Sequence, residues 1–367
     1  MTTTTTTMKL LNPGPVTLSA RVRQALLRDD LCHREPEFVA LHHRIIDKLR
    51  AVDPATASSS VALLAGSGTC AVEAMVGTFV PRSGSAVVVQ NGVYGERMAA
   101  MLSAHGKTVK AVTSPWTAAV DLAGVEAALR DGADALVAVH HETTTGRKND
   151  IQALAALAVQ AGVPLLVDAV SSFGAEALPR LPGLVAAFAS TANKCLHGVP
   201  GACFVLADEA LWARPTGATS VYLDLFRYRT PASSGSSLGA TPFTPPVHSL
   251  HALDEALSEH ADGGGLTARH ARYARHTALV RSTLRSLGLM PIIDDDHGSV
   301  CLSAFALPPG LHYAALHDFL KSEGFIVYAG QGPLADKTLR IAVMGDLDDD
   351  DIDRVLTLIG GFVRGHA

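Results

Sequence analysis

The sequence predicts an α/β protein with a mostly parallel, seven-stranded sheet in a large domain and a smaller α+β domain at the C-terminus. From about Val61, short apolar runs alternate with longer amphipathic runs. This is the pattern of parallel strands joined by helices that cover both faces of a sheet. The alternation stops near Pro215, and shorter strand-like and helical runs resume towards the C-terminus. We therefore expect an N-terminal arm over residues 1–15, a large domain over 16–255 and a small domain over 256–367.

The individual elements follow from apolar runs bounded by Gly, Pro and polar residues. The predicted strands of the large sheet are Val61–Leu64, Ala86–Val89, Thr108–Val112, Ala135–Val139, Pro164–Val167, Leu184–Phe188 and Ala202–Leu206. The predicted helices between them are Thr69–Phe79, Gly95–Ala104, Gly124–Arg130 and Ile151–Ala161. Nearer the C-terminus, the predicted strands are Val300–Ala304, Ile326–Tyr328 and Thr338–Ile341, and the predicted helices are Tyr313–Ser322 and Asp349–Val363.

Two longer segments separate these regions. Residues 215–246 are rich in Gly, Ser, Thr and Pro. A loop of this length in a compact enzyme is usually functional or lies at a subunit contact. Residues 247–287, which follow it, are expected to be helical.

The composition is typical of a compact enzyme in a reducing compartment. Of the 367 residues, 48% are hydrophobic and 18% are charged, and the formal net charge of −5 argues against a nucleic-acid surface. The five cysteines have no C-x-x-C spacing, so neither a disulfide framework nor a zinc site is expected. The N-terminal threonine run lacks the features of a secretory signal, and no apolar run approaches the roughly 20 residues of a membrane span. We expect a cytoplasmic protein without nucleic-acid, membrane or metal partners.

Two of the predicted strands lead to groups of complementary chemistry. Asp168 closes the apolar run that begins at Val163, and Lys194 follows the next apolar run after a short polar segment. Parallel strands that end in an acid and an amine can direct both groups into one crevice. The pair suits pyridoxal phosphate, because its ring nitrogen needs an acidic partner and its aldehyde needs a lysine. A surface lysine and an ordinary strand-end aspartate are the alternative.

A glycine-containing turn follows the first strand of the sheet. Segment 66–69, Gly-Ser-Gly-Thr, opens a helix, and backbone N–H groups at a helix start bind phosphate. Ser67 and Thr69 add hydroxyl donors. With Ala71, the segment also satisfies the dinucleotide fingerprint of a dehydrogenase, but that fingerprint expects an acid at the end of the next strand. This strand ends in Gln90, so we favour a single phosphate; a tight turn that needs small residues is the structural alternative.

Two further loops carry polar or aromatic groups at strand ends. Tyr94 lies between glycines and could provide a flat platform for a planar ring, or it could be a packed loop tyrosine. Segment 140–146, His-His-Glu-Thr-Thr-Thr-Gly, follows the strand Ala135–Val139. Adjacent histidines on a strand point to opposite faces, so they are a poor metal pair. The threonine hydroxyls could donate to a cofactor oxygen or cap the following helix.

Taken together and in this order, these segments resemble the class V, fold-type I pyridoxal-phosphate aminotransferases. The resemblance also includes segments 11–15 (Leu-Asn-Pro-Gly-Pro) and 33–38 (His-Arg-Glu-Pro-Glu-Phe), and it covers the chain from about residue 9 to the end. It implies a fold-type I PLP-transferase architecture with pyridoxal 5'-phosphate as cofactor. It also implies amine and 2-oxo acid substrates, and a homodimer whose subunits share their active sites.

The resemblance implies a cofactor role for several matching residues. Lys194 would bind the cofactor aldehyde covalently, and Asp168 would pair with the protonated ring nitrogen. Tyr94 would stack on the ring, and Thr143 would approach the ring hydroxyl. The phosphate would be held by Ser67, Gly68, Thr69 and, from the neighbouring subunit, Thr244.

Other matching residues are implied to bind the substrate. Arg340 would bind its acidic group, with Arg34 as a second anion contact. Arg340 could instead form a surface salt bridge, and Arg34 could pair with Glu35 or Glu37. The remaining implied substrate contacts are Asn12 and Gly14.

Within this family, several strings are most similar to those of 2-aminoethylphosphonate–pyruvate transaminases: Ser171–Gly174, Ala192–Cys195, Gly198–Gly201 and Phe243–Thr244. The implied reaction moves the amino group of 2-aminoethylphosphonate to pyruvate and gives phosphonoacetaldehyde and L-alanine. Segment 33–38 is also close to alanine– or serine–glyoxylate (or pyruvate) aminotransferases, which are the alternative.

Two other outcomes are less consistent with the residues. A cysteine desulfurase needs a reactive cysteine on a mobile loop, whereas Cys301 is expected to be buried in a strand and Cys195 to be structural. A pyridoxal-binding protein with a decayed site would not be expected to retain Lys194, Asp168 and Arg340 together.

Overall fold

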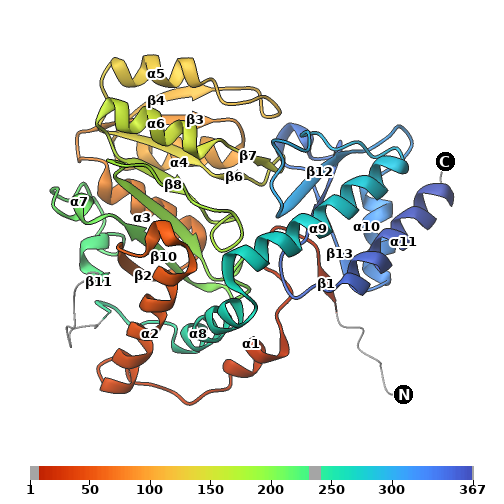
Figure 1. Ribbon diagram of the computed structural model, residues 1–367, viewed down its shortest axis with the longest axis horizontal. Helices are drawn as coiled ribbons and strands as arrows, with labels where there is room; N and C mark the ends of the chain where they lie inside the picture. The colour runs from red at the N-terminus through yellow and green to blue at the C-terminus, as the bar shows by residue number, and fades with distance from the viewer. Residues whose placement is uncertain (1–7, 231–240, 366–367) are drawn as a thin grey trace.

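The structure is a computed structural model that describes residues 8–230 and 241–365. Residues 1–7 of the expected N-terminal arm, and part of the expected loop over 215–246, lie outside the described residues. Figure 1 shows a large sheet with helices on both sides, and a smaller sheet beside it near the C-terminal helices. This arrangement confirms the predicted fold class.

Within the described residues, the large sheet contains eight strands, one more than predicted. In spatial order they are β11 (Arg229–Thr230), β2 (Ser60–Gly66), β10 (Gly201–Ala207), β9 (Ala186–Thr191), β8 (Leu165–Asp168), β5 (Ala135–Val139), β3 (Ser85–Gln90) and β4 (Thr108–Thr113). The additional strand, β11, has only two residues and no apolar run to predict it. From β9 to β4 all neighbours are parallel, whereas β10 is antiparallel to both β9 and β2.

The helices of the larger part of the chain are α1 (Ala20–Ala25), α2 (Pro36–Val52), α3 (Gly68–Phe79), α4 (Val93–Ala104), α5 (Leu122–Arg130), α6 (Ile151–Ala161), α7 (Glu209–Trp212) and α8 (Val247–Asp262). Short 3-10 turns lie at Pro54–Thr56 and Leu225–Arg227, and a small hairpin joins β6 (His141–Glu142) to β7 (Arg147–Lys148). None of the described helices is both long and apolar enough to cross a bilayer.

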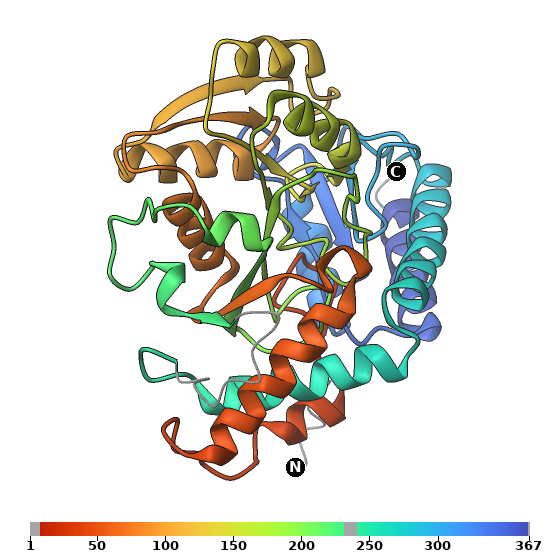
Figure 2. The same ribbon diagram turned by 60° about the vertical axis from the view of Figure 1, so that its left-hand side comes forward.

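Alternating side chains of each strand supply two separate cores. In β2, Val61 and Leu63 join the core under α2, α5, α6 and α8, whereas Ala62 and Leu64 join the core under α3 and α4. Successive side chains of a strand point to opposite faces, so a central strand covered on both sides is apolar throughout. Figure 2 shows these helices on the two sides of the sheet. Polar residues are therefore exceptional inside the sheet and are concentrated where its strands end.

The C-terminal unit is built around a three-stranded sheet of β12 (Leu302–Ala306), β15 (Thr338–Ala342) and β14 (Tyr328–Ala329). Its helices are α9 (Gly265–Ser286), α10 (Tyr313–Ser322) and α11 (Asp349–Gly365), with a 3-10 turn at Gly332–Leu334. The strand expected at Ile326–Tyr328 is in fact two short strands. β13 (Phe325–Ile326) pairs with the N-terminal β1 (Lys9–Leu10), and β14 pairs with β15.

The helical stretch expected over residues 247–287 is also divided. α8 ends at Asp262 and α9 begins at Gly265, because Gly264 adopts a left-handed conformation with φ of +90°. The expected boundary between residues 255 and 256 falls inside α8.

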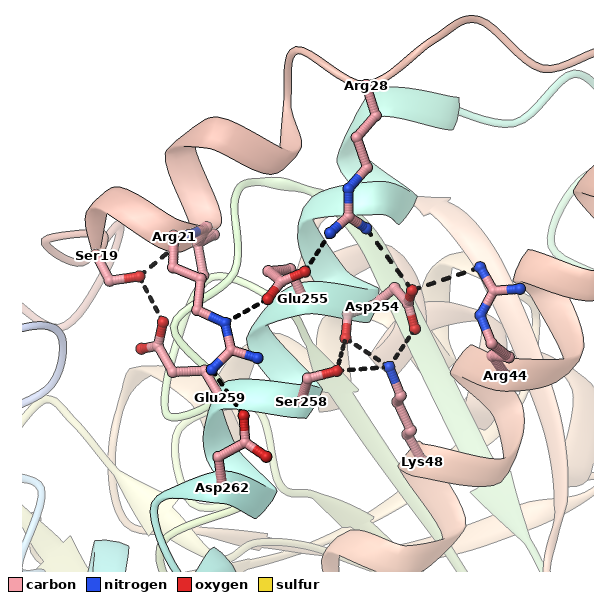
Figure 3. Close-up of polar contacts among 11 residues, drawn as sticks. Ser19, Arg21, Arg28, Arg44, Lys48, Asp254, Glu255, Ser258, Glu259 and Asp262 are labelled. Atoms are coloured by element: carbon pink, nitrogen blue, oxygen red, sulfur yellow. Dashed lines mark hydrogen bonds and ion pairs between the residues drawn. The ribbon is translucent and has the colours of Figure 1, made fainter.

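A charged network attaches α1 and α2 to α8 (Figure 3). Arg21 and Arg28 of α1 and its following turn both bind Glu255 of α8. Lys48 of α2 binds Asp254, which is 5% exposed, and donates to the Ser258 hydroxyl at 2.7 Å. Single surface ion pairs contribute little, but a network that includes a buried carboxylate fixes how the helices pack.

Candidate active site

The strands that carry the predicted acid and amine lie side by side. β8 pairs with β9 in parallel, and Asp168, the last residue of β8, lies opposite Ala189. Lys194 follows shortly after β9 ends at Thr191. The expected parallel arrangement of these two strands is confirmed, and both groups leave the same edge of the sheet.

Asp168 is a buried carboxyl group at this edge. It is 7% exposed, and its Oδ1 accepts a hydrogen bond from the Val170 backbone N–H at 2.9 Å. Burial raises its pKa to about 6, while the Val170 hydrogen bond and the charges of Lys194 and Arg97 act in the opposite direction. Among the described residues, no lysine or arginine forms an ion pair with it.

Lys194 contacts the N-terminal segment. Its Nζ donates to the backbone carbonyl of Pro13, and burial lowers its pKa to about 8. Gly14 lies against the lysine stem, since a Cβ at this position would be 2.7 Å from Lys194 Cδ. The φ of Gly14, +108°, also favours glycine. Asn12 donates from Nδ2 to the Pro15 carbonyl at 2.9 Å, so both predicted N-terminal residues belong to the segment beside the lysine.

The predicted phosphate turn lies next to the end of β8. β2 ends at Gly66 and α3 begins at Gly68, with Ser67 in the N-cap position. The Ser67 hydroxyl makes no capping hydrogen bond within the described residues, and both Ser67 and Thr69 are exposed. A Cβ on Gly68 would be 2.8 Å from the side chain of Val170, so the start of α3 approaches the segment that follows β8. Backbone N–H groups at such a helix start attract anions.

Tyr94 is the second residue of α4 rather than a loop residue. Its side chain is half-buried, and the guanidinium carbon of Arg97 lies 4.7 Å from its ring centroid. Its backbone N–H donates to Glu142 Oε2 at 3.2 Å. The Tyr94 ring therefore projects from the first turn of α4, and the hydrogen bond to Glu142 joins this turn to the β6–β7 hairpin.

Thr143 carries a buried hydroxyl group whose Oγ1 has no hydrogen-bond partner among the described residues. The suggestion that the threonines of this segment cap the following helix is wrong. α6 is capped instead by Asp150, whose Oδ1 accepts from the Ala153 N–H at 2.9 Å. A buried, unpaired hydroxyl is uncommon and indicates a missing partner.

Arg340 connects the small sheet to the Thr143 segment. It lies in β15 and is 3% exposed. Its Nε donates to Ala329 O at 2.7 Å, and its Nη1 donates to Thr143 O at 3.0 Å and to Gln331 Oε1 at 3.2 Å. It pairs with no carboxylate in the described part of the chain, so the surface salt bridge considered above is wrong.

Two predicted residues form no hydrogen bond or ion pair with the other predicted site residues in the described part of the chain. Thr244 is exposed and follows Phe243, which stacks on Tyr222 with ring centroids 5.1 Å apart. Arg34 is exposed between α1 and α2, and in the described structure it pairs with neither Glu35 nor Glu37. The alternative explanation for Arg34 as a local ion pair is therefore wrong.

Comparison with known proteins assigns the chain to a family. The family described as Aminotransferase class-V matches residues 31–355. The chain belongs to this family. A 2-aminoethylphosphonate–pyruvate transaminase from Bacillus mycoides is 36% identical over 369 residues, covering 97% of this chain and 98% of that protein. Class-V aminotransferases use pyridoxal 5'-phosphate and act on amine and oxo-acid substrates. The protein is therefore a pyridoxal-phosphate-dependent transaminase.

Solved structures of other transaminases agree closely with this fold. An aspartate aminotransferase of subgroup IV from Thermus thermophilus has a TM-score of 0.87 at 27% identity, covering 98% of this chain and 100% of that one. An alanine–glyoxylate aminotransferase from Nostoc sp. has a TM-score of 0.87 at 26% identity, covering 98% of this chain and 96% of that one.

Two residues that contact this candidate site were missed in the sequence. Glu142 is buried, and it accepts hydrogen bonds from the Tyr94 N–H at 3.2 Å and from the Thr144 hydroxyl at 2.6 Å. It thereby supplies the cap that Gly92 cannot give to α4. Arg97 was also missed, although its spacing of one helical turn from Tyr94 could have indicated contact with the ring.

The two cysteines considered for desulfurase chemistry are both buried. Cys195 and Cys301 are each 0% exposed, and their Sγ atoms lie 3.7 Å apart. Burial raises the pKa of the Cys301 thiol well above its usual range. Neither is a thiol on an open, mobile loop, and Cys301 is buried as expected, although it lies just before β12 rather than within a strand.

Proposed function

We propose that this transaminase moves the amino group of 2-aminoethylphosphonate to pyruvate and gives phosphonoacetaldehyde and L-alanine. The observation that best supports an amine substrate with an anionic end is Arg340, a buried guanidinium group whose Nη2 has no hydrogen-bond partner among the described residues. A guanidinium group offers a planar fork that matches phosphonate or carboxylate oxygens. The similarity to the Bacillus mycoides transaminase favours the phosphonate.

The side chains at the site fit pyridoxal phosphate. The unpaired Thr143 hydroxyl would donate to the oxygen on the cofactor ring. The N–H groups at the start of α3, together with the exposed hydroxyls of Ser67 and Thr69, would hold the phosphate, and Gly68 would let the backbone approach it. Tyr94 would stack on the ring.

The two charged groups at the sheet edge would divide the chemistry between them. When bound, pyridoxal phosphate supplies an electron sink for negative charge on the substrate carbon. Asp168 would hold the proton on the ring nitrogen through a charge-assisted hydrogen bond. Because burial lowers the pKa of Lys194 to about 8, a useful fraction of its amine is neutral near physiological pH. Its Nζ would hold and move the proton at the substrate carbon.

The N-terminal segment would form one wall of the substrate site. Gly14 and Pro13 lie against Lys194, and Asn12 fixes their conformation. An amine that displaces Lys194 would therefore meet this backbone first. The phosphonate would then lie towards Arg340, which the small sheet holds.

We also propose that two copies of the chain share their active sites. Thr244 and Arg34 are exposed, and within the described residues neither forms a hydrogen bond or ion pair with the other predicted residues. In a homodimer, Thr244 would reach the phosphate of the partner's cofactor, and Arg34 would reach the substrate entrance. Sedimentation velocity of the active enzyme tests this, and a fully active monomer would contradict it.

A donor screen on the purified enzyme tests the substrate. Alanine formed from pyruvate is measured with 2-aminoethylphosphonate, serine or aspartate as donor, and 2-aminoethylphosphonate should give the highest kcat/KM. Arg340→Lys keeps the charge but loses the fork, so it should raise the KM for 2-aminoethylphosphonate at least about tenfold, the value of one charged hydrogen bond. Arg354→Lys, an exposed change on α11, is the matched control. Preference for serine would refute the phosphonate assignment.

An alanine– or serine–glyoxylate (or pyruvate) aminotransferase of the same class is the second candidate. It is favoured by one feature of the site, because the Arg340 fork fits a carboxylate as well as a phosphonate. In the same screen, glyoxylate replaces pyruvate as acceptor and glycine formation is measured. Faster turnover of alanine or serine with glyoxylate than of any phosphonate would establish this alternative.

A further inference from the structure

Two thiols that the proposed reaction does not use lie beside the turn that leads into α3. Cys70 is the third residue of this helix and is half-buried, whereas Cys203 lies in β10 and is 0% exposed. β10 pairs with β2, and Cys203 lies opposite Leu64 of that strand. A Cβ on Gly66 would stand 2.8 Å from Cys70 Sγ and 3.4 Å from Cys203 Sγ. Both sulfur atoms therefore lie close to Gly66, in the turn that leads into α3.

The two thiols differ in reactivity. The neighbouring Cys203 thiol is the main cause that lowers the pKa of the Cys70 thiol, although burial acts in the opposite direction. The Cys70 thiol itself donates to the Ala65 carbonyl oxygen at 3.9 Å. In the opposite direction, the Cys70 thiol and then burial raise the pKa of the Cys203 thiol well above its usual range. Because the thiolate is the nucleophile, the more accessible Cys70 is the thiol that an oxidant would meet first.

We propose that Cys70 and Cys203 form a peroxide-sensitive thiol pair that closes to a disulfide. The Cys70 thiolate attacks hydrogen peroxide, breaks its O–O bond and becomes a sulfenic acid, and the hydroxide that leaves takes up a proton to form water. The Cys203 sulfur then attacks the sulfenic sulfur, the S–O bond breaks, and a second water leaves with the Cys203 proton. Both thiols are oxidised by two electrons in total, and one peroxide is reduced.

The position of the pair suggests a consequence for the site, and this part rests on the proposed function. The disulfide would join the first turn of α3 to β10 across the turn that contains Ser67 and Gly68. Disulfide geometry fixes the distance between the two Cβ atoms at about 3.5–4.5 Å. Adjustment of α3 to this distance would move the N–H groups that bind the phosphate. We expect the dissociation constant for pyridoxal phosphate to rise about tenfold, as for the loss of one hydrogen bond to a charged group.

Peptide mapping of the holoenzyme tests the disulfide directly. The enzyme is treated with near-stoichiometric hydrogen peroxide, remaining thiols are alkylated, and the digest is examined by mass spectrometry. We expect a cross-linked peptide pair joining Cys70 to Cys203, lighter by two hydrogen atoms than the separate peptides. Cys203→Ser should abolish it and leave Cys70 as a sulfenic or more highly oxidised species.

The chain contains its own control. The Sγ atoms of Cys195 and Cys301 are only 3.7 Å apart, but both residues are 0% exposed, so this pair should remain reduced. Oxidation of Cys195 and Cys301 before Cys70, or a Cys70 that is fully alkylated after peroxide treatment, would overturn the proposal. The mapping requires neither turnover nor a known substrate, so it can fail while the transaminase assay succeeds, and the reverse. A cross-link that leaves cofactor affinity unchanged would refute only its effect on the phosphate turn.

Discussion

Replacement of Asp168 by asparagine should stabilise the cofactor-free protein and at the same time weaken its binding of pyridoxal phosphate. The carboxyl group is 7% exposed, and burial raises its pKa from 3.8 to about 6. Between about pH 4 and pH 6 the unfolded chain has released this proton while the folded chain retains it, so folding stability falls as the pH rises through this window. Above it, the penalty is about 3 kcal/mol, because each tenfold change in acidity is worth about 1.4 kcal/mol.

Asparagine removes this penalty without a change in shape, and its amide oxygen can still accept the Val170 N–H. Urea denaturation of cofactor-free wild type and Asp168→Asn should give equal free energies of unfolding near pH 4. At pH 7.5 the variant should be more stable by up to about 3 kcal/mol. Asp336→Asn is the control, because Asp336 is exposed and makes no hydrogen bond within the described residues. A difference that is absent, or equal at both pH values, would refute this reasoning.

Three further predictions address single groups of the site. Thr143→Val removes the unpaired hydroxyl, so equilibrium dialysis should show pyridoxal phosphate binding weakened about tenfold, while the melting temperature of the cofactor-free protein should be no lower than that of the wild type. Glu142→Gln places an amide NH₂ against the N–H groups of Tyr94 or Thr144. Thermal denaturation should therefore show a free energy of unfolding that is lower by about 1–3 kcal/mol. An unchanged free energy of unfolding would mean that Glu142 does not hold α4. The pKa of Lys194 is lowered to about 8, so the initial rate of covalent cofactor uptake, followed by absorbance, should rise as the pH passes through about 8 and then level off. A rate that keeps rising towards pH 10 would contradict this burial effect.

The large sheet could be predicted because its strands are buried on both faces. Val61–Leu64 and Ala86–Val89 are apolar at every position, so a run of residues is enough to identify them. β9 shows the limit of that signal. It was expected at Leu184–Phe188, but it continues to Thr191, because Ser190 and Thr191 are buried and pair with β10.

Features that depend on distant partners could not be predicted. The run at Ile326–Tyr328 gives no indication that its two ends pair with different strands. The break between α8 and α9, by contrast, had a local signal in the glycines at residues 263–265. Glu142 appeared in a recognised segment, yet its role as a cap depends on the place of α4 in the fold, which periodicity does not specify.

The polar groups at the sheet edge have a common physical property that links the fold to the proposed chemistry. Asp168 is a buried acid without a cation in contact, Thr143 is a buried hydroxyl without a partner, and Arg340 is a buried cation without an anion, each within the described residues. Each arrangement costs free energy in the protein alone. The apolar cores on the two faces of the sheet can offset such costs. A cofactor with a cationic ring nitrogen and an acceptor oxygen would pair with Asp168 and Thr143, and a substrate with an anionic end would pair with Arg340. Ligand binding should therefore raise the free energy of unfolding above that of the ligand-free protein.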